Sequence, residues 1–589
     1  MLATAIFGVL SFQTPAFPVA AEVEREYVAP GIGERIDGYL QRITGFGWSG
    51  VVLLIKDKRV VISKAYGLAD RDRKIPMRTT SVFDIGSLAK QFTATAIMRL
   101  EREGKLSFQD RLGKFLPEAT EAYRDITLHQ LLQHRAGIPW PFGEFERTNK
   151  GDALKRIFAR PPLFKAGERF EYSNSGYTLL AAVVEAVTKE HFHDYLQRTV
   201  LQPAGMRHTG FFGSEMPPVP QSWIAQGYDE VKVRMQMEAQ TDDSWTELGA
   251  GEIVSSVPDL YRWFLALQGE KILDSAQKTL MWTPGEVVPP TDSYFSPSYG
   301  YGWMVQTLLS GKKRIYHGGD GYAHGCGFSW YPDDDMLMIS LTNIRHDWFP
   351  TTIRGDRIPP LIALGKKFTD APAFSSIPYS PKPILGEYRL PTGGKVAIWE
   401  DDYGLQIGAD GQDACDLLDP APKGKEPERT GLNQKSVEGF RKFLAGNLEA
   451  LADLGVGPGF GKMVFDELKG FEKRWGKFQD VRSLGIYTGG YVDYSQVLEF
   501  RYERGRLQEK LHWSPTRLGA TWQECPRYAS PIRLQPITAD RWVAWNIITR
   551  KTVYVERTKE GLRVEGPERV VEAIALQTAR SSPKIFTNP

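Results

Sequence analysis

Apolar and polar positions in the first 370 residues follow patterns that predict alternating helices and strands. A short apolar segment ends at Gly86, and the run 93–100, rich in Ala and long side chains, extends to Gly104, which predicts a helix. A polar loop at 170–177 leads into the apolar run 178–184, which predicts a loop braced against a second helix. Further on, two apolar strand-like segments surround a glycine-rich, Asp-containing turn, which predicts a β-hairpin, and another strand-like segment follows at 336–343.

The pattern changes after residue 370. A segment rich in proline and serine predicts a linker, and short apolar runs at 385–390, 396–399 and 405–408 predict strands. A helical stretch from 439 to 454 precedes further strands such as 494–503, which indicates an α+β module. The predicted boundaries are as follows: a signal peptide at 1–21, a main domain at 25–370, a linker at 371–384, a small β-rich segment at 385–428 and an α+β accessory domain at 429–589.

Length and composition agree with a globular protein of two or three domains. The chain has 589 residues, of which 42% are hydrophobic and 24% charged. Its net charge of +2 gives no reason to expect a nucleic-acid or membrane-surface partner. No metal or cofactor is predicted, since His191 and His193 point different ways on a helix and Asp333–Asp335 is typical of a solvated turn. Composition leaves the oligomeric state open.

The N-terminus favours export to the periplasm or the outside of the cell. Residues 3–10 form a short apolar run, and Val19-Ala20-Ala21 before Glu22 fits a signal-peptidase site, although a positively charged start is missing. No segment is long and apolar enough for stable membrane insertion. Cys326 is predicted to be a buried strand residue. Spacing alone leaves open whether Cys415 and Cys525 pair in an oxidising compartment.

Ser87 and Lys90 lie three residues apart at the start of the first predicted helix, so they share one face. A serine hydroxyl is a weak nucleophile at neutral pH, and a desolvated lysine amine can act as its base. The helix N-terminus adds a positive end beside the hydroxyl. Taken alone, the four residues are explained more simply by an N-cap serine and a solvated lysine.

Two polar elements downstream change that interpretation. Tyr172 offers a phenolic hydroxyl that can relay a proton, and Asn174 offers a donor and an acceptor. In the predicted hairpin, His317 precedes Gly318 and Gly319, which let a ligand approach the strand backbone, and Asp320 follows. Singly, each has a structural explanation: Tyr172 packs, Asn174 caps a helix, and His317 is an edge histidine.

Together, the three motifs have the order and spacing of one family. Ser-x-x-Lys, Tyr-x-Asn about 85 residues later and His-x-Gly about 145 residues after that resemble the serine β-lactamases and penicillin-recognising enzymes. The resemblance is greatest to class C β-lactamase-like proteins, D-alanyl-D-alanine peptidases, D-aminopeptidases and family VIII esterases. Segments 127–139, 250–260 and 299–303 also resemble the family, and the resemblance covers roughly residues 30–368.

The resemblance implies an α/β (α+β) fold with an antiparallel sheet flanked by helices, an all-helical region and the site between them. It implies that Ser87 attacks the substrate carbonyl and forms an acyl-enzyme, while Lys90 and Tyr172 transfer the protons; which of them is the base stays open. Asn174 would orient the substrate amide or the lysine. The backbone N–H groups of Ser87 and Asp320 would form the oxyanion hole. The implied substrate-binding residues are Asn174, His317, Gly318, Gly319 and Asp320.

One departure from the family pattern narrows the expected chemistry. Carboxylate-binding members usually have lysine where His317 stands, and a histidine of ordinary pKa is mostly neutral at neutral pH. We therefore expect a serine hydrolase of small esters, amides or D-amino-acid-containing peptides. Two alternatives stay open: a true β-lactamase or cell-wall D-Ala-D-Ala peptidase, and a non-catalytic penicillin-fold binding or sensor protein.

Overall fold

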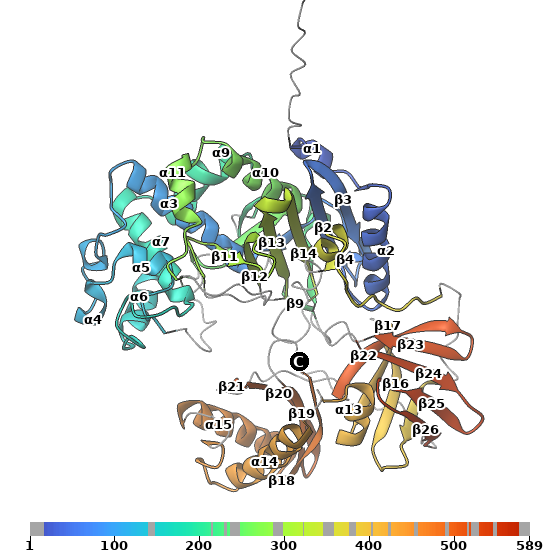
Figure 1. Ribbon diagram of the computed structural model, residues 1–589. Coiled ribbons are helices and arrows are strands. Elements are labelled where there is room, and N and C mark those ends of the chain that lie inside the picture. Colours follow the sequence, from blue (N-terminus) through green and yellow to red (C-terminus); the bar gives the residue numbers. More distant parts are fainter. Residues whose placement is uncertain are drawn as a thin grey trace, which may run out of the picture.

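The computed structural model describes residues 17–576 except for 140–147, 214–215, 229–232, 236–244, 246–247, 287–297, 322, 345–357, 376–383, 402–403, 422–425, 453–457, 489–493, 515–516, 520–528 and 546–550. An N-terminal unit combines a large sheet with helices, and a C-terminal unit combines a barrel with an inserted α/β segment (Figure 1).

A seven-stranded antiparallel sheet forms the centre of the N-terminal unit. Its strands lie in the order β1-β3-β2-β14-β13-β12-β11. They are β1 (Tyr27–Val28), β2 (Gly50–Lys56), β3 (Arg59–Tyr66), β11 (Met304–Thr307), β12 (Lys313–Asp320), β13 (Gly325–Tyr331) and β14 (Met336–Thr342). The predicted antiparallel sheet is confirmed, and the predicted hairpin is the pair β12–β13. Cys326 is buried in β13, as expected.

Helices cover both faces of this sheet, which explains why β2 is apolar along its whole length. Val52 and Leu54 pack with α2 (Ile32–Gly45), whereas Val51, Leu53 and Ile55 pack in the cluster that contains α10 (Val257–Gln268). Successive side chains of a strand point to opposite faces, so a strand buried on both sides is a continuous apolar run. The sheet is therefore a rigid, two-sided scaffold.

A helical region lies beside the sheet (Figure 1). Its central helix α7 (Asn174–Thr188) is buried on nearly all sides and packs against α3 (Ala89–Arg102) and α5 (Leu128–Leu132). A helix that is apolar all round belongs in a core. The other helices are α4 (Glu121–Arg124), α6 (Lys150–Phe158), α8 (Phe192–Leu196), α9 (Gln202–Ala204) and α11 (Ser275–Met281). A small sheet of β6 (Val82–Asp84), β10 (Ile253–Ser256) and β7 (Gly210–Phe211) joins this region to the rest.

The C-terminal unit contains a closed eight-stranded barrel. Its strands, in order around the barrel, are β15 (Gly386–Arg389), β16 (Lys395–Asp401), β17 (Gly404–Asp410), β22 (Ala529–Thr538), β23 (Arg541–Trp545), β24 (Thr552–Arg557), β25 (Gly561–Glu565) and β26 (Val570–Ala575). The expected boundary at residue 428 does not separate two sheets. Strands from both sides of it close one barrel, because their apolar side chains, such as Ile407 and Leu534, fill one core.

An α/β segment is inserted between β17 and β22. It comprises α13 (Gln412–Leu418), α14 (Glu426–Leu444), α15 (Pro458–Trp475), β18 (Phe478–Thr488), β19 (Tyr494–Tyr502), β20 (Gly505–Ser514) and β21 (Arg517–Gly519). The four strands form one sheet in sequence order, and α14 and α15 share an apolar core with it. The expected order of helices followed by strands is thus observed within this insertion.

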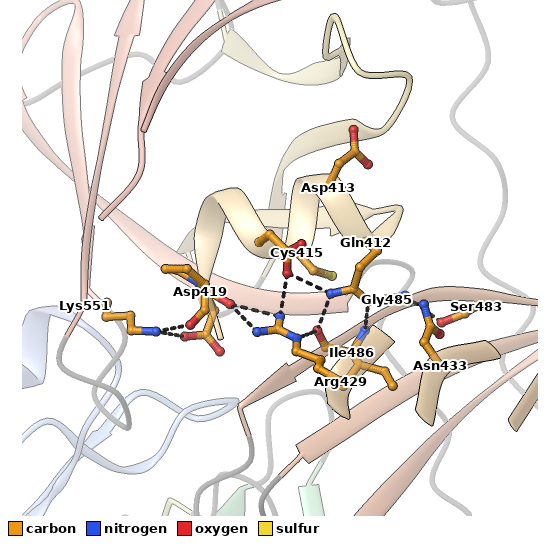
Figure 2. A network of polar contacts seen from close by, with 12 residues as sticks. Gln412, Asp413, Cys415, Asp419, Arg429, Asn433, Ser483, Gly485, Ile486 and Lys551 are labelled. Carbon is orange, nitrogen blue, oxygen red and sulfur yellow. Dashed lines mark hydrogen bonds and ion pairs between the residues drawn. The ribbon is translucent and has the colours of Figure 1, made fainter. Parts of the chain in front are cut away.

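A buried arginine joins the insertion to the end of α13 (Figure 2). Arg429 is 2% exposed; its Nε donates to the Ile486 carbonyl at 2.7 Å, and Nη1 and Nη2 donate to the Asp419 carbonyl at 3.0 Å. Gln412 forms hydrogen bonds with both backbone groups of Ile486, each at 2.9 Å. Nearby, Cys415 is a buried thiol whose sulfur faces Gly485. Cys525 lies outside the described residues, so whether it pairs with Cys415 stays open.

The barrel packs against the N-terminal unit through a shared apolar cluster. Val543 and Trp545 of β23 are buried together with residues of α2 and β2, and the rings of Phe46 and Trp545 lie 5.9 Å apart. Backbone contacts support this junction, since Ser375 N–H donates to the Pro536 carbonyl at 2.8 Å. The two units therefore share an apolar interface.

The described part of the N-terminus belongs to the folded unit. Phe17 packs on Phe264, and the Tyr261 hydroxyl donates to the Pro18 carbonyl at 2.7 Å. Helix α1 (Ala20–Val23) follows directly. Residues 1–16 of the predicted signal peptide lie outside the described residues, so the signal peptide stays a prediction. Across the described parts of the chain, no helix has both the length and the apolar character to cross a membrane.

Candidate active site

Ser87 stands at the start of a short 3₁₀ turn (Gly86–Leu88) that continues into α3. Within residues 81–90, Ser87 alone is partly exposed, and the others are buried. Gly86 has a φ of +46°, and a Cβ there would lie 2.7 Å from the carbonyl carbon of Asp320. Glycine is thus required, because the turn contacts the backbone at the end of β12 directly. Ser87 is thus the accessible residue of a tightly packed turn.

Lys90 is fully buried and lies beside Ser87, as the spacing predicts. Its Nζ is 3.0 Å from Ser87 Oγ, and it donates to the Ala250 carbonyl at 2.8 Å. The same Nζ lies 4.9 Å from the centre of the Tyr172 ring. The amine is therefore held between the hydroxyl, a backbone carbonyl and an aromatic face.

The backbone on either side of the Ala250 carbonyl is held by Glu252, a residue that was not predicted to belong to the site. The Glu252 carboxylate accepts hydrogen bonds from the N–H groups of Gly249, at 2.8 Å, and Gly251, at 3.1 Å, which flank Ala250. Glu252 is 5% exposed. The sequence did contain a signal for this role: an acidic residue in a glycine-rich segment just before a strand. A carboxylate buried at such a place needs hydrogen-bond donors, and the backbone N–H groups of the glycines can supply them.

Tyr172 and Asn174 lie at the N-terminus of α7. The helix is capped by Ser173, whose Oγ accepts from Gly176 N–H at 3.3 Å, so Asn174 is the first helical residue rather than the cap. Asn174 Oδ1 is buried and has no hydrogen-bond partner among the described residues. A buried amide oxygen without a donor is costly, so it is suited to accept from a ligand or a catalytic group.

His317 is buried in β12, and its ring is fixed at both nitrogens. Nε2 lies 2.8 Å from the Tyr299 hydroxyl, and Nδ1 lies 2.5 Å from the Gly318 carbonyl. Burial, and secondarily the positive charge of Lys90, lower the pKa of His317 to about 3. The ring is thus neutral at neutral pH. His317 is also not a histidine on an edge strand, since β12 lies between β11 and β13.

Gly319 has a different role from the one expected of it. A Cβ at this position would lie 2.0 Å from the Ile85 carbonyl oxygen and 2.4 Å from Cys326 Sγ. What approaches β12 here is the protein's own backbone just before Ser87, rather than a ligand. Together with Gly86, this glycine brings the backbone of Asp320 beside that of Ser87, where the two predicted oxyanion donors lie.

The structure thus brings Ser87, Lys90, Tyr172 and the end of β12 into one place, between the sheet and the helical region, and Asn174 follows Tyr172 as the first residue of α7. Two further side chains reach the same place without having been predicted. Tyr299 contacts His317, and His134 packs against Tyr172, with ring centres 4.3 Å apart. Both lie in segments whose sequences resembled the family, but neither carried a motif of its own.

Known proteins resemble both this domain and the whole chain. The family model described as beta-lactamase matches residues 38–358. Penicillin-binding protein 4* of Bacillus subtilis is 26% identical over 51% of this chain and 69% of its own length. The putative penicillin-binding protein PbpX of the same organism is 30% identical over 46% of this chain and 65% of its own length. The chain therefore spans about two thirds of the length of these relatives.

Among solved structures, the octameric penicillin-binding protein homologue from Pyrococcus abyssi aligns with a TM-score of 0.50 and 18% identity. The alignment covers 92% of this chain and 99% of that one, so the likeness in fold includes the C-terminal unit. The family model spans more than half of the chain and contains every residue of the geometry above. This protein therefore belongs to the beta-lactamase family.

Proposed function

We propose that the protein is a serine hydrolase that acts through a Ser87 acyl-enzyme on small esters, amides or D-amino-acid-containing peptides, with residues 25–370 as its catalytic domain. The observation that carries the proposal is the 3.0 Å approach of Lys90 Nζ to Ser87 Oγ, with the amine buried. A lysine amine is strongly hydrated in water, and burial removes that hydration. A buried lysine beside a serine hydroxyl can therefore act as the base that accepts the hydroxyl proton.

In the first step, Ser87 Oγ bonds to the substrate carbonyl carbon and its proton passes to Lys90 or Tyr172. The carbonyl oxygen becomes an oxyanion that accepts hydrogen bonds from the backbone N–H groups of Ser87 and Asp320. The bond to the alcohol or amine then breaks, and the leaving group takes the proton back. Water attacks the resulting ester in the same way, which releases the acid and restores Ser87.

The choice of substrate class rests on the charge of the site. His317 is neutral because its pKa is about 3, so it supplies no cation for a substrate carboxylate. Both ring nitrogens are already engaged, by the Tyr299 hydroxyl and the Gly318 carbonyl, so His317 contributes a neutral aromatic ring. Substrates with a neutral group next to the scissile bond therefore fit best. The free oxygen of Asn174 suits a substrate amide N–H.

A second candidate function is acylation by penicillins or by cell-wall peptides that end in D-alanine. The names of two relatives, both penicillin-binding proteins, favour it. The neutral His317 argues for weak recognition of the carboxylate that such compounds carry. The third possibility, a non-catalytic sensor, requires Ser87 to be unreactive.

We also propose that the protein acts in the periplasm or outside the cell. The apolar run at 3–10 and the small residues at 19–21 support this. Mass spectrometry of the N-terminal peptide, from protein recovered outside the cytoplasm of an expressing cell, tests it. Recovery in the cytoplasm alone would contradict it.

The function is tested by intact mass after separate exposure to a fluorophosphonate, penicillin G and p-nitrophenyl acetate. We expect a fluorophosphonate adduct and ester turnover in the wild type, and neither in Ser87→Ala. Ser275→Ala is the matched control, since Ser275 is an exposed serine at the start of helix α11. A lasting penicillin adduct, or rapid penicillin hydrolysis, would favour the second candidate. If no probe forms an adduct with the wild-type protein, the proposal that it is a serine hydrolase is wrong.

A further inference from the structure

Tyr172 is held from both sides by a single residue, His134. The backbone N–H of Glu171 donates to the His134 carbonyl at 2.8 Å, and the backbone N–H of Ser173 donates to His134 Nδ1 at 3.1 Å. Residues 171 and 173 are the two chain neighbours of Tyr172. Because each is bonded to His134, the backbone on either side of the phenol is fixed relative to one imidazole.

The ring of His134 also fixes the side chain. Its centre lies 4.3 Å from that of Tyr172, with 36° between the ring planes. The same imidazole contacts Tyr177 at 5.0 Å and Tyr299 at 4.6 Å. Tyr299 in turn contacts His317. His134 is thus the common neighbour of the aromatic groups on this side of Lys90.

His134 adopts a costly state to make these contacts. Its φ is +54°, in the left-handed region that side chains other than glycine rarely adopt. It is 2% exposed, and its Nε2 has no hydrogen-bond partner in the described part of the chain. Strained backbone and an unpaired polar group at one buried residue are typical of functional sites.

The protonation state required by the geometry agrees with the surroundings. Nδ1 can accept from Ser173 N–H only when it carries no proton, so a neutral ring has its proton on Nε2. Burial, and then the charges of Lys90 and His317, lower the pKa of His134 well below its ordinary value. The neutral ring that the hydrogen bond from Ser173 N–H requires is therefore the stable form of His134.

We propose that His134 is a positioning residue that sets the place of the Tyr172 phenol relative to Lys90 and Ser87. The inference rests on the proposed function, in which Tyr172 takes part in proton transfer. It adds a residue that contacts neither the substrate nor Ser87. Because a displacement of about 1 Å can cost about a hundredfold in rate, a loosened Tyr172 should be visible in kinetics.

The test measures the rate of fluorophosphonate labelling of Ser87 and the turnover of p-nitrophenyl acetate. His134→Leu replaces the imidazole with an apolar side chain that has no acceptor, and we expect both rates to fall about 10- to 100-fold. His134→Asn offers an oxygen to Ser173 N–H and tolerates a positive φ, so we expect rates within about fivefold of the wild type. His129→Leu is the control, because His129 lies on the same segment but contacts Tyr301 instead.

A double-mutant cycle separates positioning from general structural support. If His134 acts through Tyr172, His134→Leu should change the rates less than about twofold in a Tyr172→Phe background. An equal fall in both backgrounds would overturn the proposal. His134→Gln, whose amide lies one bond further from the backbone, serves if the leucine variant does not fold, and a wild-type rate in a folded Gln variant would also overturn it. No labelling of the wild type would instead refute the proposed function.

Discussion

Gly319→Ala tests the proposed oxyanion hole indirectly, because it displaces the Asp320 N–H without altering Ser87 or Lys90. A Cβ on residue 319 would lie 2.0 Å from the Ile85 carbonyl oxygen and 2.4 Å from Cys326 Sγ. The oxygen belongs to backbone just before Ser87 and has little freedom to move. Ordinary contacts between a methyl group and oxygen need about 3.4 Å, so the end of β12 must shift by roughly 1 Å or more. Asp320 is the next residue and shifts with it.

This shift moves the Asp320 N–H away from the proposed oxyanion, whereas Ser87 and Lys90 keep their contact. Removing one such donor costs about 10²–10³ in kcat, which is about 2.7–4 kcal/mol of transition-state stabilisation. We therefore expect kcat for p-nitrophenyl acetate to fall about 100-fold or more, with kcat/KM falling equally, because the lost interaction forms only in the transition state. Overpacking should also lower the free energy of unfolding, by about 1–3 kcal/mol.

Steady-state kinetics of Gly319→Ala are compared with those of Gly38→Ala. Gly38 lies in helix α2, and a Cβ there would meet only Arg42 Nη1, at an ordinary 3.5 Å. The control variant should keep wild-type kinetics. A folded Gly319→Ala protein with kcat within about threefold of the wild type would refute the assignment of Asp320 N–H as an oxyanion donor.

Three further predictions concern stability and support of the site. Burial gives His317 a pKa of about 3 and His324 a pKa of about 4. Below about pH 6.5 these two histidines bind protons in the unfolded chain but stay neutral in the folded protein. The free energy of unfolding is therefore highest above pH 6.5 and decreases as the pH falls toward the two lowered pKa values, by about 2 kcal/mol for each histidine at pH 5. Equal urea midpoints at pH 7 and pH 5 would contradict this. Glu252→Ala removes the acceptor of two N–H groups, that of buried Gly249 and that of half-buried Gly251, so we expect a loss of about 1–3 kcal/mol in the free energy of unfolding by urea and slower fluorophosphonate labelling; unchanged labelling would show that Ala250 needs no support. Arg429→Met removes three hydrogen bonds to buried carbonyls and should destabilise the C-terminal unit by about 3 kcal/mol, seen as faster proteolysis there, while ester turnover by the remaining folded protein persists. Proteolysis at the wild-type rate would count against this account of the network.

The local part of the candidate site could be predicted from the sequence, and the supporting part could not. Ser87 and Lys90 are three residues apart on one helix, so their contact follows from helix geometry. Glu252 acts on Lys90 through a carbonyl 160 positions further along the chain, and no local pattern records such a contact. His134 is recognisable only from its positive φ and its tertiary neighbours.

The glycines and the C-terminal strands show the same limit. The sequence favours a ligand as the group that approaches Gly319, but a glycine in a strand indicates only that some group comes close and does not identify that group. The approaching group proved to be the Ile85 carbonyl. Similarly, the short strands before residue 428 were predicted, but nothing in their residues identifies strands more than 100 positions later as their partners. Alternating apolar residues specify a buried face and not a neighbour.

The pairing of distant strands has a consequence for how the chain is made. In the N-terminal unit Gly50 pairs with Thr342, and in the barrel Tyr388 pairs with Ala575. In each unit, two strands that pair with each other are separated by a long stretch of sequence. Neither unit can therefore complete its sheet until its last strand has left the ribosome. Such non-local pairing slows folding and leaves unpaired strand edges exposed in the meantime. Cutting the chain between residues 428 and 429 and separating the two pieces would make that transient state permanent. Strands β15 and β17 of the first piece would lose their partners β26 and β22 of the second, which leaves four free edges suited to aggregation.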